Sequence, residues 1–325
     1  MLVLAAALAM AGPPRARAAD SALSAPVTLR TPTGDLFGTE VVPAGVTHTP
    51  VVLIIAGSGP TDRDGNSPVP IAPGRTLRTD SYKMLAAALA ANGIASVRYD
   101  KRGIAASAAA MSGKSESDYT FETGIDDAVA WVKLLRANPR FSKVIIAGHS
   151  EGSLIGMLAA ARAKADGFVS LEGAGRRASV VLREQLGARG VPEAMYAATL
   201  DSLDAGKTVA NAPAALAALF RPSVQPYLIS WFRYDPALEL RKLPFATLIV
   251  QGAHDVQTSA ADAGALAAAP GAMLVMVDGM THVLKDGPAD AQGQFAGVYS
   301  DPTAPLDTAM VTAIIAYVRS APKPL

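Results

Sequence analysis

Two kinds of hydrophobic pattern alternate along most of this chain. Short, continuous apolar runs rich in β-branched residues are typical of strands buried on both faces of a sheet. Between them lie longer segments with apolar residues at helical spacing. The alternation predicts an α/β fold, with a mostly parallel central sheet and helices on both faces. The strand-like runs are 50–57, 94–100, 143–148, 167–173, 244–252 and 272–279, and the helix-like segments are 81–93, 124–138, 153–164, 260–269 and 306–320.

Two stretches near the N-terminal end follow other patterns. Residues 26–42 alternate apolar and polar positions around Thr33-Gly34-Asp35, which predicts an antiparallel β-hairpin. Residues 58–74 consist largely of turn-forming residues and are expected to form a loop.

The alternation stops between residues 174 and 243, where three helical segments follow one another without a strand. We expect this insertion to form a helical cap over one edge of the sheet. The predicted core of the domain is then residues 19–173 and 244–325.

The first residues resemble an export signal. A dozen apolar residues, too few for a membrane span, precede the small-x-small sequence Ala16-Arg17-Ala18. This predicts a signal peptide over residues 1–18 with cleavage near Ala18, an exported protein (periplasmic or secreted), and no stable membrane insertion.

Composition excludes several classes of function. Half of the 325 residues are hydrophobic and 18% are charged, as in a globular protein, and the net charge is +1. No basic surface is available for nucleic acid, so we expect no nucleic-acid partner. The chain has no cysteine, which excludes thiolate nucleophiles and cysteine-ligated zinc. We expect no cofactor and no metal; the oligomeric state is not predicted.

The segment Gly148-His149-Ser150-Glu151-Gly152 matches the pattern G-x-S-x-G. It lies directly between a predicted strand and a predicted helix, which is the context of a nucleophile elbow. In such an elbow the serine adopts a strained conformation, and the glycines let neighbouring backbone approach. Ser150 is therefore the predicted nucleophile.

A serine hydroxyl needs a base, and the chain has four histidines. His282 follows the strand at 272–279 in a short loop, at the sheet edge where α/β proteins build their sites. It is the predicted base, with His254 as the alternative. His48 is expected at the surface, and the side chain of His149 is expected to point away from Ser150.

The base in turn needs a carboxylate. Asp255 ends the segment LIVQGAHD and should lie beside the loop of His282, because their strands are neighbours in sequence. Asp278 and Glu172 compete for this role. The order Ser150, Asp255, His282 is the chain order of α/β-hydrolases.

An acyl-transfer site also needs donors for an oxyanion. The backbone N–H of Glu151 is one predicted donor. Ser58 N–H, or else Gly59 N–H, is the other, since these residues follow the strand at 50–57. Gly57-x-Gly59 is not a dinucleotide fingerprint, because Asp62 stands where a third glycine is required.

The motifs LIIAGSGPTDRDGN, SVRYDKRG, AGHSEGS, LIVQGAHD and GMTHVLK, in this order, resemble bacterial α/β-hydrolases of the serine aminopeptidase S33/dienelactone hydrolase-like group. The resemblance implies an α/β-hydrolase fold, a triad of Ser150, Asp255 and His282, and an oxyanion hole at Ser58 and Glu151. It also implies a structural role for a loop motif made of Asp100, Arg102 and Gly103. One departure is Ser153, where relatives usually carry glycine, and we expect tighter packing there.

These features predict a serine hydrolase that cleaves carboxylic esters of small molecules through an acyl-enzyme. The apolar cap favours short- or medium-chain esters. An aminopeptidase or amidase would need an acidic group in the cap, for which Glu184, Glu193, Asp201 and Asp204 are candidates. A catalytically inactive binding protein is the third alternative. Dehalogenases and epoxide hydrolases of this fold carry aspartate at the nucleophile position, so Ser150 counts against both.

Overall fold

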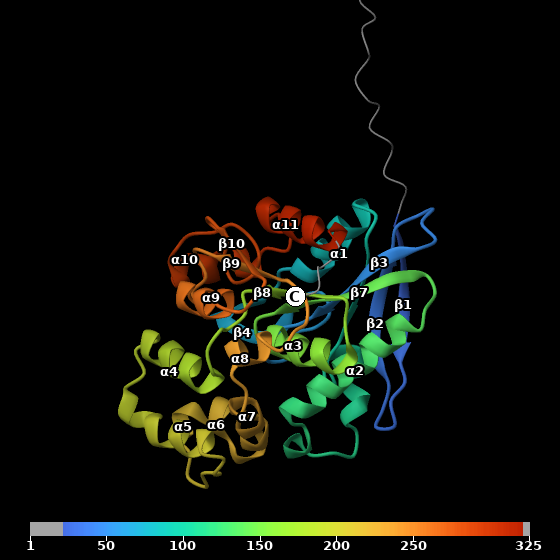
Figure 1. Ribbon diagram of the computed structural model, residues 1–325. Coiled ribbons are helices and arrows are strands. Elements are labelled where there is room, and N and C mark those ends of the chain that lie inside the picture. Colours follow the sequence, from blue (N-terminus) through green and yellow to red (C-terminus); the bar gives the residue numbers. More distant parts are fainter. Residues whose placement is uncertain (1–21, 321–325) are drawn as a thin grey trace, which may run out of the picture.

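The computed structural model describes residues 22–320 and contains one large sheet (Figure 1). The expected signal peptide at residues 1–18 lies outside these residues. The sheet has eight strands in the order β1-β2-β6-β3-β7-β8-β9-β10. The six strands from β6 to β10 in this order are parallel to one another, and β2 is antiparallel to both β1 and β6. The mostly parallel sheet and the β1–β2 hairpin are confirmed. The strands are β1 (Leu23–Leu29), β2 (Leu36–Val42), β3 (Thr49–Ile55), β6 (Ala95–Tyr99), β7 (Phe141–His149), β8 (Gly167–Leu171), β9 (Thr247–Gly252) and β10 (Ala272–Val277).

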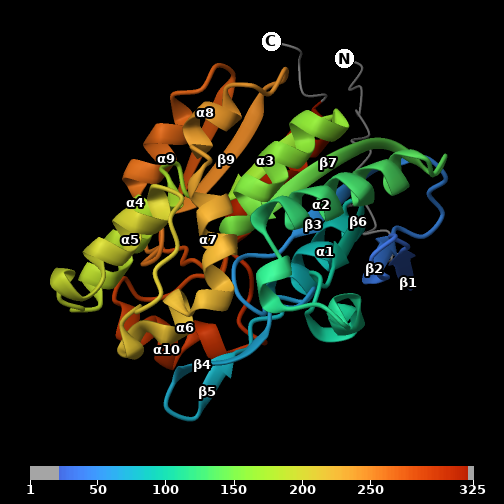
Figure 2. The ribbon, with the colours of Figure 1, turned by 90° about the horizontal axis from the view of Figure 1, so that it is seen from below.

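Helices cover both faces of the sheet (Figures 1 and 2). On β3, Leu53 packs in one hydrophobic cluster with Trp131 of α2, whereas Ile54 packs in another with Leu85 of α1 and Ile314 of α11. Both faces of the strand are therefore buried, as its continuous apolar run indicates. The helices are α1 (Ser81–Ala91) and α11 (Thr308–Arg319) on one face, and α2 (Phe121–Arg136), α3 (Glu151–Ala163) and α9 (Ala260–Ala267) on the other.

The segment between β8 and β9 is helical and has its own small core. Leu200, Phe220 and Phe232 pack together within it. It joins the rest of the domain through α7, where Trp231 stacks on Phe121 with ring centroids 5.7 Å apart. These helices are α4 (Ala178–Ala188), α5 (Ala197–Asp204), α6 (Ala217–Phe220), α7 (Gln225–Phe232) and α8 (Pro236–Leu240), and we call them the cap (Figure 2). No helix within residues 22–320 is both long and apolar enough to cross a membrane.

The expectation of a loop over residues 58–74 is wrong for its second half. β4 (Ser67–Ala72) and β5 (Arg75–Leu77) form a separate two-stranded hairpin. Its pairing is irregular, because Pro68 and Pro70 lack the N–H that a regular ladder requires. Proline is tolerated here because both strands are edges. The hairpin lies near α10 (Ala291–Ala296), and it lines a cavity described below (Figure 2).

A buried ion pair ties the loop after β6 to helix α2. Arg102 contacts Asp127 through two hydrogen bonds, Nη2 to Oδ1 at 2.6 Å and Nε to Oδ2 at 3.0 Å. Their side chains are only 2% and 8% exposed. Asp100 of the same motif accepts hydrogen bonds from Arg63 and from Ala106 N–H. The motif thus holds the loop in place.

We expect Asp127→Ala to lower the free energy of unfolding by about 3–5 kcal/mol, because it leaves the Arg102 guanidinium buried without its partner. Asp126→Ala is the matched control. Its side chain is 74% exposed and lies 3.4 Å from Arg162, so its removal should cost no more than about 1 kcal/mol. Urea denaturation of both variants measures the difference. Equal losses would contradict a stabilising role for the buried pair.

Candidate active site

Ser150 occupies the sharp turn between β7 and α3, in a strained backbone conformation with φ of 54° and ψ of −121°. The turn brings three backbone segments into close contact. A Cβ at Gly148 would lie 2.2 Å from the carbonyl oxygen of Gly152. A Cβ at Gly152 would lie 2.5 Å from the carbonyl oxygen of Ile55, at the end of β3. Glycine is therefore required at both positions, as in a nucleophile elbow.

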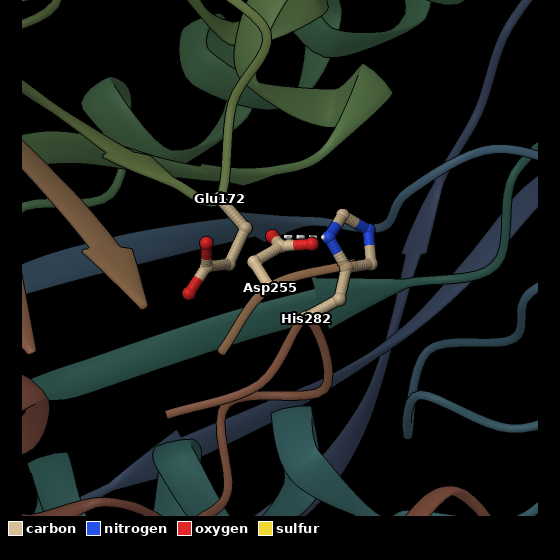
Figure 3. A group of neighbouring side chains, drawn as sticks. All are labelled: Glu172, Asp255 and His282. Carbon is tan, nitrogen blue, oxygen red and sulfur yellow. Dashed lines mark hydrogen bonds and ion pairs between the residues drawn. The ribbon is translucent and has the colours of Figure 1, made fainter. Parts of the chain in front are cut away.

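His282 and Asp255 form a hydrogen-bonded pair at the ends of the neighbouring strands β10 and β9 (Figure 3). His282 Nδ1 lies 2.7 Å from Asp255 Oδ2, and the two side chains are 6% and 0% exposed. Burial alone would raise the pKa of Asp255, but His282 and hydrogen-bond donors lower it below its ordinary range. An ionised carboxylate only accepts, so His282 Nδ1 carries the proton and Nε2 is free to act as a base.

Further donors fix the Asp255 carboxylate. Oδ1 accepts from the backbone N–H groups of Gln257, at 2.6 Å, and Thr258, at 3.0 Å. Oδ2 also accepts from the Thr258 hydroxyl at 2.8 Å. The carboxylate is thus held in the orientation that meets His282.

Ser150 and His282 line the same cavity, which has a volume of about 630 Å³. The structure therefore brings the predicted nucleophile, base and acid to one place. Within residues 22–320, Ser150 Oγ makes no hydrogen bond to His282. Such contacts often tighten only when a substrate is bound.

His149 is buried next to Ser150 but cannot serve as its base. Its Nε2 donates to the carbonyl oxygen of His282, and its Nδ1 accepts from the Tyr82 hydroxyl, both at 2.7 Å. Burial, followed by the neighbouring His282, lowers the pKa of His149 to about 3. A neutral His149 therefore links the loop of His282 to helix α1.

The alternatives for base and acid lie elsewhere. His254 Nδ1 lies 2.7 Å from the carbonyl oxygen of Gly287, and exposed His48 lies beside the carbonyl oxygen of Pro139. Asp278 is exposed. None of these three side chains makes a hydrogen bond to Asp255 or His282 within residues 22–320.

Glu172, the remaining alternative, is completely buried beside Asp255 (Figure 3). Its Oε1 accepts from Gly252 N–H at 2.8 Å, and within residues 22–320 its Oε2 has no hydrogen-bond partner. Burial, followed by the charge of Asp255, raises the pKa of Glu172 well above its ordinary value. Burial beside Asp255 therefore favours the neutral form of the Glu172 carboxyl group, as expected when two carboxyls share a buried site.

Glu172, Asp255 and His282 are also residue types that bind metals, and their ligand atoms lie within 4.8 Å of one another. A metal would have to displace the proton that His282 shares with Asp255, and a second proton on Glu172. The hydrogen bonding therefore favours an imidazole held by a carboxylate over a metal site.

Two backbone amides point to an anion site beside Ser150. The N–H of Glu151 begins helix α3, and the N–H of Ser58 follows β3. Among the hydrogen bonds of residues 22–320, neither amide has an acceptor. Free amides at a helix start favour negative charge. Gly59 also lines the cavity and stays an alternative donor.

Sequence reasoning missed three contributors to the site: Tyr82, Lys101 and the burial of Glu172. Tyr82 and Glu172 lie in none of the quoted motifs, and Lys101, although it lies inside SVRYDKRG, is not a residue to which the resemblance assigns a role. Only the weak signal of polar residues next to strand ends could have found them. Ser153, singled out as a departure, is buried and lies 2.8 Å from Ser170 Oγ.

The chain is similar to known hydrolases. A family model described as "Serine aminopeptidase, S33" matches residues 66–193, which include Ser150. The esterase EstD of Thermotoga maritima is 27% identical over 237 residues, or 70% of this chain and 52% of that esterase. The chain thus spans about half the length of this curated relative.

Solved structures share the fold. Est1E from Butyrivibrio proteoclasticus has a TM-score of 0.56 at 16% identity, covering 91% of this chain and 99% of that one. Dienelactone hydrolase from Anabaena variabilis has a TM-score of 0.52 at 16% identity, covering 93% and 99%. The α/β-hydrolase fold and the resemblance to the serine aminopeptidase S33/dienelactone hydrolase-like group are confirmed.

We expect Gly152→Ala to destabilise the protein by about 1–3 kcal/mol, because the new methyl group meets backbone oxygens that cannot move independently. It should also lower activity by displacing Ser150. Gly264→Ala in helix α9 is the control, since nothing lies within 4 Å of its added Cβ. That change should stabilise slightly, by about 0.5–1 kcal/mol. Thermal unfolding and turnover of both variants provide the measurement, and similar effects would contradict the close approach.

Glu172→Gln should alter how stability depends on pH. The folded protein keeps the Glu172 proton that the unfolded chain loses near its ordinary pKa of 4.5. The protonated Glu172 side chain therefore contributes its full share to the free energy of unfolding below pH 4.5, and this share is lost as the pH rises towards the folded-state pKa. Glutamine stays neutral, so the variant should gain stability relative to the wild type as the pH rises above about 4.5. Urea unfolding across this range tests it. A constant difference would show that Glu172 is ionised in the fold.

Proposed function

We propose that this α/β-hydrolase is a serine esterase that cleaves carboxylic esters of small molecules through an acyl-enzyme on Ser150. The observation that carries the proposal is the 2.7 Å contact between His282 Nδ1 and Asp255 Oδ2, with His282 and Ser150 facing one cavity. This arrangement leaves His282 Nε2 as the acceptor for the Ser150 proton.

In the proposed reaction Ser150 Oγ attacks the ester carbonyl while His282 Nε2 takes its proton. The N–H groups of Ser58 and Glu151 donate to the oxyanion that forms. The alcohol leaves with the proton from His282. Water, deprotonated by His282, then attacks the acyl-enzyme and releases the acid. Asp255 keeps its negative charge throughout and stabilises the imidazolium.

The shape of the site supports a substrate that extends on both sides of Ser150. Besides the cavity shared with His282, a second cavity of about 880 Å³ lies between the core and the cap. Ser58, Pro60, Ser150 and Gln257 line both cavities. An ester carbonyl at Ser150 could therefore place its acyl part in one cavity and its alcohol part in the other.

The cavity under the cap is the larger and more apolar of the two. A volume in this range suits small-molecule ligands, whose sites are mostly apolar with a few polar groups. We assign the acyl chain to it, and short or medium chain lengths to the substrate. Apolar side chains from both parts line it, among them Leu154, Val181, Leu182, Leu219, Leu228 and Trp231.

The charged residues near the cavity under the cap support an ester as the substrate. A substrate of an aminopeptidase carries a free ammonium group, which needs a carboxylate partner. None of the four acidic cap residues considered for that role lines the cavity: Glu184, Glu193, Asp201 and Asp204 each pair with an arginine. The two carboxylates that do line it, Glu116 and Glu151, lie beside Arg221 and Lys101. A free carboxylate to hold an ammonium group is therefore missing from the residues described as lining it.

A panel of nitrophenyl esters of increasing acyl length tests the proposal. We expect turnover with a maximum at short or medium chains and, in Ser150→Ala, a loss of kcat by at least about 10³-fold. Amino-acid nitroanilides, run beside the esters, measure the competing aminopeptidase activity, and their preferential cleavage would favour that alternative.

An alkyl-phosphonate probe separates an enzyme from an inactive binding protein. Labelling should occur on Ser150 in the wild type and be absent in Ser150→Ala. Failure to label the folded wild type, together with equal ester turnover by both proteins, would refute the assignment.

A further inference from the structure

Lys101 is a buried lysine to which the reaction described above assigns no role. It follows β6 and is only 8% exposed, although it lines the cavity under the cap. Lysine is seldom buried unless its ammonium group is paired. The contacts of this ammonium group therefore indicate what it is for.

The first contact is with Gly57, at the end of β3. Lys101 Nζ donates a hydrogen bond to the Gly57 carbonyl oxygen. On its other side, Gly57 N–H donates to the Tyr82 hydroxyl at 3.2 Å. Gly57 also lies against the nucleophile, since a Cβ added to it would be 3.1 Å from Ser150 Cβ. Both polar groups of this glycine are thus held beside Ser150.

The Gly57 carbonyl belongs to the same peptide group as the Ser58 N–H. This peptide is planar and trans, so its C=O and N–H point in opposite directions. Holding the oxygen on Lys101 therefore sets the direction of the Ser58 N–H. That amide is one of the two proposed oxyanion donors.

The second contact is with Glu151. Lys101 Nζ lies 3.7 Å from Glu151 Oε1, and the N–H of Glu151 is the other proposed donor. Burial lowers the pKa of Lys101, while the Glu151 carboxylate opposes this by favouring the charged form. One ammonium group therefore contacts both segments that would form the oxyanion hole.

We propose that Lys101 is a positioning residue for the oxyanion hole: its bond to the Gly57 carbonyl orients the Ser58 N–H towards the substrate oxygen. This inference rests on the proposed esterase function. A group of this kind acts on the transition state, in which the oxygen carries a full charge, more than on the bound ester. Its removal should therefore lower kcat and leave KM nearly unchanged.

The test compares Lys101→Met, which removes the donor and keeps an apolar stem, with Lys101→Arg and Lys101→Gln. We expect Lys101→Met to lower kcat by about 10- to 100-fold, somewhat less than the loss of a direct oxyanion donor. KM should change by less than about threefold. Lys101→Arg and Lys101→Gln keep a donor for the Gly57 carbonyl and should recover part of kcat. If Lys101→Met does not fold, Lys101→Leu, which also removes the donor and keeps an apolar side chain, takes its place in the comparison.

An alkylboronic acid provides a readout that a merely structural role would not change. It forms a tetrahedral adduct with a serine hydroxyl and so mimics the charged intermediate. Its affinity should fall in Lys101→Met by about the same factor as kcat. An unchanged kcat and boronate affinity would overturn the inference, as would parallel losses in KM and in thermal stability that account for the whole effect. If the wild type itself neither hydrolyses esters nor labels at Ser150, the proposed function fails instead.

Discussion

The close packing of three backbone segments around Ser150 is the constraint on which the rest of the site depends. β3, β7 and the start of α3 meet where only glycine fits, at Gly148 and Gly152. This contact holds Ser150 at a positive φ, and it also presses Gly57 against the serine. Steric contacts alone thus hold Ser150 against the loop that follows β3.

Hydrogen bonds then join the loops that surround this point. Gly57 N–H donates to Tyr82, Tyr82 donates to His149, and His149 donates to the carbonyl oxygen of His282. This series of hydrogen bonds is possible because His149 is neutral, with one ring nitrogen accepting and the other donating. Burial keeps it neutral by lowering its pKa to about 3. His149, beside Ser150, therefore has a structural role, whereas His282 is the base in the reaction that we propose.

Burial and hydrogen bonding together also determine which other groups around the site carry a charge. Asp255 keeps its charge because His282 and three further hydrogen bonds stabilise it, whereas burial favours the neutral form of Glu172 beside it. Elsewhere around Ser150, the charges of Lys101 and Glu151 balance each other, with Lys101 Nζ 3.7 Å from Glu151 Oε1. The site thus holds one negative charge behind the imidazole and free N–H groups where an oxyanion would form, which is the distribution that acyl transfer requires.

The sequence by itself determined the features that local patterns encode. Apolar runs of strand length, separated by helical periodicity, predicted the parallel sheet, and the placement of Gly148–Gly152 between strand and helix predicted the elbow. Only the tertiary structure decided which side chains from distant parts of the sequence meet at the site. Lys101 and Gly57 are 44 residues apart, and no periodicity relates them. Likewise, the sequence does not distinguish Glu172 from any other loop carboxyl, and only tertiary packing buries it. Pro68 and Pro70 are typical of a loop in the sequence, but the structure places them in strand β4, which pairs with β5. Local propensity acts over a few residues, whereas burial and pairing depend on how distant segments pack.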